Sequence, residues 1–237
     1  MFKFSIALNE NNGETYGIKN LEIKDGFYGE SLSKLSPEKL ENIRCHLIKT
    51  LSKIVLYTAT ESVKNYDSYV LFFRHAHIIG VENVLLSGAA IKGATKEEIL
   101  KIVAIGEAFA IKVLFEVEAE GFDEFNFDTY KEIKSEATGL VFDPLELLKR
   151  NGQSPFFGPG GLYKSKFKDD VVFLKIKDAD KTDMTPLLPE KGHSEIKECM
   201  STLISRSYAG YFSFEKYGED IEIADVITAA TNALCNM

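Results

Sequence analysis

VVFLKIKD, at positions 171–178, is an apolar run that finishes in charged residues. Three other runs in the second half of the chain end in the same way, namely VLFE at 113–116, LVFD at 140–143 and YFSFE at 211–215. Val and Phe dominate these runs, and segments of helical pattern separate them, which is typical of the buried parallel strands of βα units. The chain is therefore expected to contain a parallel sheet whose strands carry charged residues at their carboxyl ends.

Each of these runs has two different faces, because successive side chains of a strand point to opposite sides. Leu174 and Ile176 are expected to share one face of their strand, and Lys175 and Lys177 the other. Three strand-end acids are expected to oppose their apolar neighbours in the same way, namely Glu116, Asp143 and Glu215. If the strands close into a barrel, the charged side chains converge at the end where active sites of such barrels are built.

Eight strand-like runs occur along the chain, which is the number that a closed α/β barrel needs. They cover residues 2–8, 19–24, 53–59, 82–87, 111–118, 139–143, 171–177 and 210–215. The first two runs are separated by NENNGETYGI at 9–18, which is too short and too rich in glycine for a full helix. We therefore predict a single (β/α)8 TIM barrel over residues 1–237, in which the first helix is shortened or missing.

Helices between the strands are indicated by signals at their ends. Ser36-Pro37-Glu38 supplies an N-cap, a proline at the first helical position and an early acid. Thr95 and Glu98 have the spacing of a capping box, which predicts a helix that runs to about Phe109. A closing helix is expected from Tyr217 to Met237.

The bulk composition is that of one soluble domain. The chain has 237 residues, 45% of them hydrophobic, which is enough for a full core. A net charge of −8 repels phosphate backbones, so nucleic acid is not an expected partner. FKFSIAL at 2–8 is too short and too polar for a signal peptide or a membrane span. Three cysteines without CxxC spacing are typical of reduced thiols, and we expect a cytoplasmic protein without a membrane partner.

Six segments resemble, in order, the xylose isomerase-like TIM barrel superfamily of sugar phosphate isomerases and epimerases. NLEIKDG (20–26) resembles its second strand, and AIKVLFE (110–116) resembles the strand that ends in a ligand glutamate. The other four are HAHIIGVENVLLSG (75–88), GLVFDPLE (139–146), which resembles the "D..H" strand, VVFLKIKDAD (171–180), which resembles the "HxKD" strand, and the tail at 192–215. The order and spacing of the segments, rather than any single one, carry the resemblance.

The resemblance implies a divalent metal, Mn, Mg or Zn, and two glutamates that move a proton on a carbon next to a carbonyl. By position, it implies Glu116, Asp143 and Glu215 as metal ligands, with Glu116 and Glu215 also as the acid/base pair. Lys175 stands where "HxKD" has its histidine, and Glu146 stands where "D..H" has one. A protonated lysine offers a metal no lone pair, so the residues leave open whether a metal is bound or none.

Charge balance raises the same question, because clustered carboxylates cannot all stay ionised in a poorly solvated pocket without a countercharge. Either a cation or nearby lysines would supply it. The inward acids are Glu22, Glu116, Asp143 and Glu215, and the inward lysines are Lys24, Lys175 and Lys177. These numbers favour a salt-bridged interior without a metal, or a weak, oxygen-rich site for Mg or Mn.

Other interpretations of the same residues stay open. A strand-end carboxylate can simply anchor a loop by accepting backbone N–H bonds, and Glu118 would replace Glu116 if the register slipped. Lys175 is interpreted as a counterion, an anion binder or a catalytic amine. Histidines 46, 75 and 77 lie in helical stretches and are expected at the surface or in packing. The segment at 154–161 is expected to be a turn-rich loop over the barrel mouth, because it lacks a phosphate-loop lysine.

The predicted function is isomerisation or epimerisation of a small sugar or sugar phosphate through an enediolate. Glu116 and Glu215 would be base and acid, and Lys175 or a metal on Asp143 would stabilise the oxyanion. Candidate substrate-binding residues are Glu22, Lys24, Lys177 and His193. One alternative is a lyase or dehydratase that uses Lys175 directly, and another is a non-catalytic barrel that binds a sugar or a partner. The expected partner is a small carbohydrate, and a homo-oligomer stays open.

Overall fold

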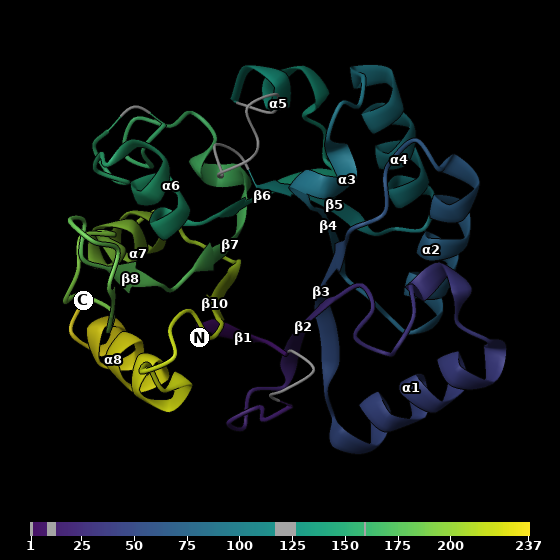
Figure 1. Cartoon of the computed structure of the whole chain (residues 1–237), viewed down its shortest axis with the longest axis horizontal. Helices are drawn as coiled ribbons and strands as arrows, with labels where there is room; N and C mark the ends of the chain where they lie inside the picture. The colour runs from purple at the N-terminus through teal and green to yellow at the C-terminus, as the bar shows by residue number, and fades with distance from the viewer. Residues whose placement is uncertain (1, 9–12, 117–126, 159) are drawn as a thin grey trace. The chain divides into compact units, whose positions relative to one another are not determined.

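Eight strands form a closed barrel in the order β1-β10-β7-β6-β5-β4-β3-β2, as the computed structural model shows (Figure 1). The structure describes residues 2–8, 13–116, 127–158 and 160–237. The barrel strands are β1 (Lys3–Ala7), β2 (Asn20–Lys24), β3 (Lys53–Ala59), β4 (Asn83–Leu86), β5 (Lys112–Glu116), β6 (Thr138–Phe142), β7 (Val171–Lys175) and β10 (Tyr211–Phe214). The (β/α)8 barrel that the sequence predicts is confirmed.

Helices follow most of the strands. They are α1 (Pro37–Thr50), α2 (Tyr66–Ile78), α3 (Gly88–Ile91), α4 (Lys96–Ala108), α5 (Phe127–Ile133), α6 (Pro144–Asn151), α7 (Ile196–Ile204) and α8 (Ile223–Cys235). Two short 3-10 helices, η1 (Leu32–Lys34) and η2 (Lys168–Asp170), and an antiparallel pair, β8 (Asp178–Ala179) and β9 (Pro186–Leu187), complete the described elements. Within the described residues, no helix is long and apolar enough to cross a membrane.

The predicted strands agree with the structure to within two residues at each described end. Residues 117 and 118, at the end of the fifth predicted strand, lie outside the described part. The connection between β1 and β2 is described from residue 13, and it contains a turn at Tyr16 and Gly17, not a helix. The reduced first crossover is therefore confirmed for residues 13–19, whereas residues 9–12 are not described.

The predicted helix starts are confirmed at two positions and wrong at a third. Ser36 Oγ accepts a hydrogen bond from the Lys39 N–H at 3.2 Å, and Thr95 and Glu98 form both bonds of the capping box. Helix α8 begins at Ile223 and not at Tyr217. The Tyr217 hydroxyl donates to the Leu187 carbonyl at 2.5 Å, which holds that residue in the loop before the helix.

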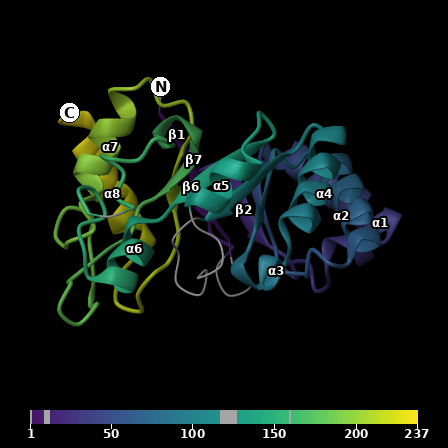
Figure 2. The ribbon, with the colours of Figure 1, turned by 90° about the horizontal axis from the view of Figure 1, so that it is seen from above.

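Contacts divide the chain into two compact units. Unit 1 contains the described residues of 1–4, 117–127 and 140–237, and unit 2 contains those of 5–116 and 128–139. In unit 2, helices α1, α2 and α4 lie side by side on the outside of the strands (Figure 2). Helix α4 approaches β5 so closely that a Cβ at Gly106 would lie 2.6 Å from Val113 Cγ2. The prediction of one domain over the whole chain stays a prediction.

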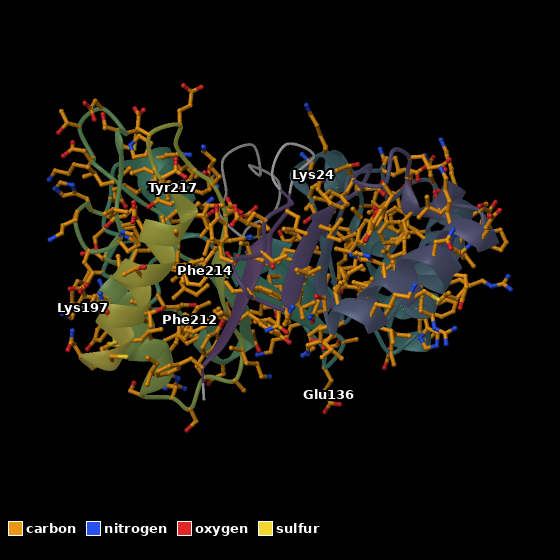
Figure 3. All side chains as sticks on the ribbon, turned by 90° about the horizontal axis from the view of Figure 1, so that it is seen from below. Lys24, Glu136, Lys197, Phe212, Phe214 and Tyr217 are labelled. Carbon is orange, nitrogen blue, oxygen red and sulfur yellow. The ribbon has the colours of Figure 1, made fainter. Side chains whose placement is uncertain are left out.

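Unit 1 has aromatic side chains on both faces of its strands. Phe212 and Phe214 are buried and contact Phe4, with ring centroids 6.4 and 5.7 Å away (Figure 3). On the other face, Phe173 and Tyr211 stack with their ring centroids 4.9 Å apart. Because side chains alternate along a strand, Lys175 and Glu215 lie on the same face as this stacked pair, nearer the carboxyl ends.

Candidate functional site

Four charged side chains gather at the carboxyl ends of β6, β7 and β10, which are neighbours in the barrel. Asp143 directly follows β6, Lys175 is the last residue of β7, and Glu215 directly follows β10. Lys177 lies two residues beyond β7, where the Ile176 N–H still donates to the Ser213 carbonyl at 2.9 Å and prolongs the strand pairing. We call Asp143, Lys175, Lys177 and Glu215 the strand-end cluster; all four belong to unit 1.

Ion pairs join the four members of the strand-end cluster. Lys175 Nζ lies 3.0 Å from Glu215 Oε2, and Lys177 Nζ lies 2.7 Å from Glu215 Oε1. Lys177 also forms an ion pair with Asp143 Oδ2. Two ammonium groups therefore face two carboxylates, and the cluster is formally neutral.

Exposure differs among the members of the cluster. The side chains of Lys175 and Lys177 are each 8% exposed, and that of Asp143 is 2% exposed. Glu215 keeps 28% of its side chain exposed. Glu215 is therefore the member that a small molecule from solvent can reach most readily.

The charges of the cluster support one another. Burial by itself would raise the pKa of Glu215, but the ammonium groups of Lys175 and Lys177 outweigh it and hold that pKa well below its ordinary value. Burial would likewise lower the pKa of Lys177, but Asp143 and Glu215 hold it well above its ordinary value. Near neutral pH, Glu215 is thus a carboxylate and Lys177 an ammonium.

Asp143 has a structural role besides its ion pair. Its Oδ1 accepts the Leu145 and Glu146 N–H groups at 3.0 and 3.2 Å, so Asp143 is the N-cap of α6. The loop-anchoring interpretation of a strand-end carboxylate therefore holds for one oxygen of Asp143. Glu146 itself pairs with Lys149 at 2.7 Å.

Asp178, for which no role was predicted from the sequence, anchors the loop after β7. This side chain is fully buried, and it accepts the N–H groups of Ala179, Gly192 and Ser194 at 2.8–2.9 Å. A Cβ at Gly192 would clash with Asp178 Oδ1, so only glycine fits there. The bonds fix the backbone beside Lys177. The only sequence signal was an aspartate after a strand, which does not tell an anchor from a reactive group.

Three of the predicted site residues lie in unit 2. Glu22 is 3% exposed and accepts a hydrogen bond from Ser5 Oγ at 2.6 Å. Lys24 is exposed at the end of β2, and Glu116 is half-buried at the end of β5. Their roles stay predictions, and Glu118 lies outside the described residues.

The histidines lie at the surface or in packing contacts. The side chain of His193 is 44% exposed. Its Nδ1 accepts the Lys181 N–H at 3.3 Å and lies 3.8 Å from Asp180 Oδ2. Its role as a substrate contact stays a prediction. The remaining three are on helices, as expected, namely His46 on α1 and His75 and His77 on α2.

The described residues do not fit a divalent metal. No group of three or more His, Cys, Asp or Glu side chains in the described ranges is placed to hold one. In the strand-end cluster, a cation bound to Glu215 would meet the ammonium groups of Lys175 and Lys177, which already contact both of its carboxylate oxygens. A metal ion held by the ligands that the resemblance implies would thus be repelled by two ammonium groups of the same sign.

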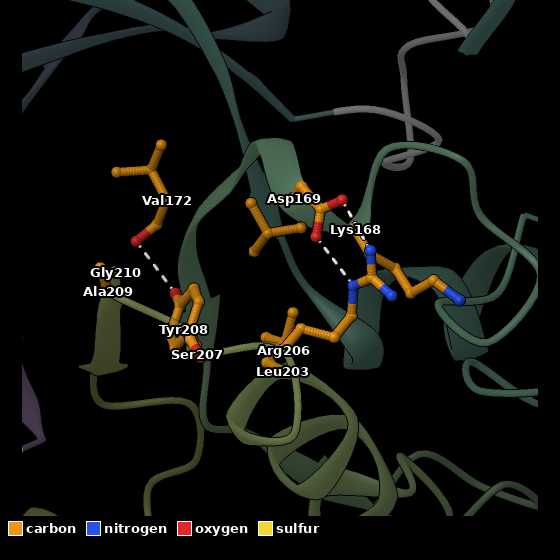
Figure 4. Close-up of a pocket in the computed structure, with 10 residues that line it drawn as sticks. Lys168, Asp169, Val172, Leu203, Arg206, Ser207, Tyr208, Ala209 and Gly210 are labelled. Carbon is orange, nitrogen blue, oxygen red and sulfur yellow. Dashed lines mark hydrogen bonds and ion pairs between the residues drawn. The ribbon is translucent and has the colours of Figure 1, made fainter.

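A separate cavity of about 320 Å³ opens at the amino-terminal ends of β7 and β10 (Figure 4). Arg206 and Asp169 form a two-bond ion pair at its edge, at 2.7 and 2.8 Å. The Tyr208 hydroxyl donates to the Val172 carbonyl at 2.9 Å. No member of the strand-end cluster lines this cavity. In such barrels, residues at the amino-terminal ends of the strands usually serve stability, and active sites lie at the other end.

Solved structures share this fold over nearly the whole chain. An IolI protein with a bound zinc atom superposes with a TM-score of 0.70 at 15% identity, covering 98% of this chain and 96% of that one. The chain has the same TIM-barrel fold as the IolI protein. A D-psicose 3-epimerase solved in the presence of D-fructose matches with a TM-score of 0.69 at 11% identity, over 99% of this chain and 98% of that one.

A further structure with this fold contains magnesium. It is a xylose isomerase-like TIM barrel protein from Mycobacterium smegmatis, with a TM-score of 0.64 and 17% identity over 92% of this chain and 83% of that one. Neither a protein-family model nor a curated protein matches the sequence. Identities this low establish the fold alone.

Proposed function

We propose that the protein is an isomerase or epimerase of a small sugar or sugar phosphate, and that the reaction takes place at the strand-end cluster. The observation that carries this proposal is the partly exposed Glu215 carboxylate held between two buried ammonium groups. Proton transfer next to a carbonyl needs an acid/base group and a positive group at the oxygen where charge develops. The cluster supplies both at the strand ends where active sites of this fold are built.

Each member of the cluster has a proposed role. Lys175 and Lys177 would stabilise the negative oxygen of the enediolate, and Asp143 would keep Lys177 in place through its ion pair. Glu215 would move the proton. A substrate oxygen that draws an ammonium group away from Glu215 would raise the pKa of that carboxyl toward its ordinary value and make it a better base.

The residues predicted from the sequence in unit 2 complete the proposal. Glu116 would be the second acid/base group, and Glu22 and Lys24 would contact substrate, as would His193 of unit 1. Their positions after strands or in loops support these roles. The proposed substrate is a small carbohydrate, such as the D-fructose in whose presence the psicose epimerase structure was solved.

Exchange of carbon-bound hydrogen tests the proposed reaction. The protein is incubated in D2O with a panel of aldoses, ketoses and their phosphates, and deuterium at the carbon next to the carbonyl is followed by NMR. Wild type is expected to exchange hydrogen with at least one substrate. Glu215→Gln is expected to exchange it about 10²–10⁴-fold more slowly, because the acid/base group is lost.

Glu190→Gln is the matched control for Glu215→Gln. Glu190 pairs with Lys197 at 3.2 Å, outside the strand-end cluster, and is expected to leave the exchange rate unchanged. The proposal would be contradicted if wild type exchanged hydrogen with no sugar of the panel. It would also be contradicted if Glu215→Gln exchanged hydrogen at the wild-type rate.

A second candidate is a barrel that binds a sugar without changing it. The observation that favours it is the double ion pair of Glu215, which makes this carboxylate a weak base before any substrate enters. This candidate predicts that a sugar of the panel binds, by saturation-transfer NMR, without deuterium uptake. The lyase that would use Lys175 as an amine is disfavoured, because an ammonium group paired with Glu215 at 3.0 Å is no nucleophile.

A further inference from the structure

We propose that Lys175 and Lys177 together take the place of a divalent cation, so that the strand-end cluster works without a bound metal. The catalytic part of this proposal rests on the proposed function, whereas the prediction about metal affinity does not. Two structures of the same fold were solved with zinc and with magnesium, so a divalent metal is the alternative that this proposal has to be tested against.

Every carboxylate oxygen of the strand-end cluster already has a donor. Glu215 Oε1 and Oε2 contact Lys177 and Lys175 at 2.7 and 3.0 Å. Asp143 Oδ2 pairs with Lys177, and its Oδ1 accepts two backbone N–H groups of α6. A metal would have to displace these donors, and an ammonium group cannot become a ligand in exchange.

The charge of the two lysines also matches that of a divalent cation. Two ammonium groups carry the same total charge as one divalent cation, and they face two carboxylates. A divalent metal at the cluster would leave two positive charges without a countercharge, and both ammonium groups would repel it at short range. Salt screens this repulsion weakly, because the two lysine side chains are mostly buried.

Burial and backbone contacts hold both lysines in place. Both side chains are 8% exposed. Lys175 is paired in register with Ser213 of β10, which holds its backbone next to the strand that leads to Glu215. The loop after Lys177 is fixed by the three N–H bonds of the buried Asp178. The ammonium groups are therefore built-in parts of the site.

Calorimetric titration with MnCl2 and with ZnCl2 tests the proposal on protein first stripped with EDTA. Wild type is expected to show no saturable binding tighter than about millimolar, a strength typical of weak sites. Lys175→His is expected to bind Zn at least about tenfold more tightly, because imidazole supplies a lone pair and one positive charge is gone. The double variant Lys175→His/Lys177→Met is expected to bind more tightly still.

Lys197→His is the matched control, since Lys197 forms an exposed ion pair with Glu190 at 3.2 Å. It is expected to bind metal like wild type. Lys175→Arg, which keeps the charge, is a second variant for the case that Lys175→His does not fold, and it is expected to stay as indifferent to Mn and Zn as wild type. Circular dichroism checks the fold of each variant.

Micromolar binding of Mn or Zn by wild type that is lost in Glu215→Gln would overturn the proposal, as would Lys175→His that folds but binds metal no better than wild type. The deuterium exchange assay, run with and without EDTA, separates the two proposals. Exchange that requires added metal would leave the isomerase proposal standing and overturn this one. Absence of exchange together with absence of metal binding would overturn only the isomerase proposal.

Discussion

Lys177 is the residue that ties the strand-end cluster together, because it bridges Asp143 and Glu215 from a position beyond the end of β7. Removing it leaves Lys175 as the single ammonium group of the cluster beside two carboxylates. Lys177→Met is therefore expected to lower the free energy of unfolding by about 3–5 kcal/mol, the usual cost of leaving a buried charge without its partner. Urea denaturation at pH 7 measures it.

Lys197→Met is the control for this prediction, because its ion pair with Glu190 is exposed. It is expected to change the free energy of unfolding by no more than about 0.5 kcal/mol. Equal effects of the two substitutions would show that the buried cluster is not a distinct source of stability.

Two fully buried serines form a matched pair for a second test. Ser5 Oγ donates to Glu22 at 2.6 Å, whereas Ser213 Oγ has no hydrogen-bond partner in the described part of the chain. Ser5→Ala is expected to destabilise by about 1–3 kcal/mol, because it leaves a buried carboxylate short of a donor. Ser213→Ala is expected to be neutral or stabilising by up to about 1 kcal/mol, because it removes an unpaired hydroxyl.

Thermal and urea unfolding of both serine variants measure the difference. A Ser213→Ala variant that loses as much stability as Ser5→Ala would mean that the Ser213 hydroxyl has a bonding partner in solution, such as a buried water.

At the scale of single residues, the sequence predicted which charged side chains share the inward face, but not which of them pair. Lys175 and Lys177 were expected to balance inward acids that include Asp143 and Glu215, because all four have the inward parity at the ends of strands. The pairing of Lys177 with Asp143 could not be predicted. It depends on the register between β6 and β7, which shifts at Leu140 and Val141, and such a shift leaves no pattern in the sequence.

Helix α6 shows how one element serves both the fold and the site. Its N-cap Asp143 gives one oxygen to the helix and the other to Lys177. Asp143→Asn is expected to keep the cap but lose the ion pair, and Asp143→Ala is expected to lose both. Asp143→Ala should therefore be the more destabilising of the two, by about 1 kcal/mol, the usual value of a cap.

Thr95→Ala is the control for the cap, since Thr95 begins α4 at an exposed capping box. It is expected to cost about 1 kcal/mol by urea denaturation. If Asp143→Asn and Asp143→Ala were equally destabilising, the cap of α6 would add nothing to the stability of the protein.

At the scale of elements, local signals in the sequence predicted the strands and the starts of two helices, but not the start of α8. The strands were predicted from their apolar runs, and α1 and α4 from caps that need only residues near in sequence. The start of α8 was placed too early at Tyr217. That residue is held in a loop by Leu187, a contact between residues far apart in the sequence, which a local pattern cannot reveal.

For the whole molecule, the strand-end cluster makes stability depend on pH at the acid side. The pKa of Glu215 is depressed in the folded protein, so its contribution is present above the ordinary glutamate value of about 4.3 and is lost as the pH falls toward the folded value. Wild type is expected to lose stability between about pH 5 and pH 2 more steeply than Lys175→Met, in which Glu215 has lost one ammonium partner.

At alkaline pH, the dependence of stability on pH has the opposite sign. The pKa of Lys177 is raised in the folded protein, so its contribution is present below the ordinary lysine value of about 10.4 and is lost as the pH rises through the folded value. Urea denaturation at a series of pH values measures both limbs. A Lys175→Met curve parallel to that of wild type on the acid side would contradict the prediction.

The net charge of −8 does not come from the strand-end cluster, which is formally neutral. The barrel could be predicted from the sequence because eight apolar runs, most of them separated by segments of helical pattern, leave few other folds. The sequence left the choice between metal and lysines open, because that choice depends on which side chains meet at the ends of strands.

The central claim is that two lysines neutralise Glu215 in place of a cation, and a titration of the Glu215 carboxyl carbon by NMR in metal-free protein tests it most directly. Selective 13C labelling of glutamate and the Glu215→Gln spectrum assign the signal. We predict that Glu215 stays ionised well below the ordinary glutamate pKa of about 4.3 in wild type, and that Lys175→Met moves its midpoint upward. A midpoint at or above the ordinary value in folded, metal-free wild type would contradict the account.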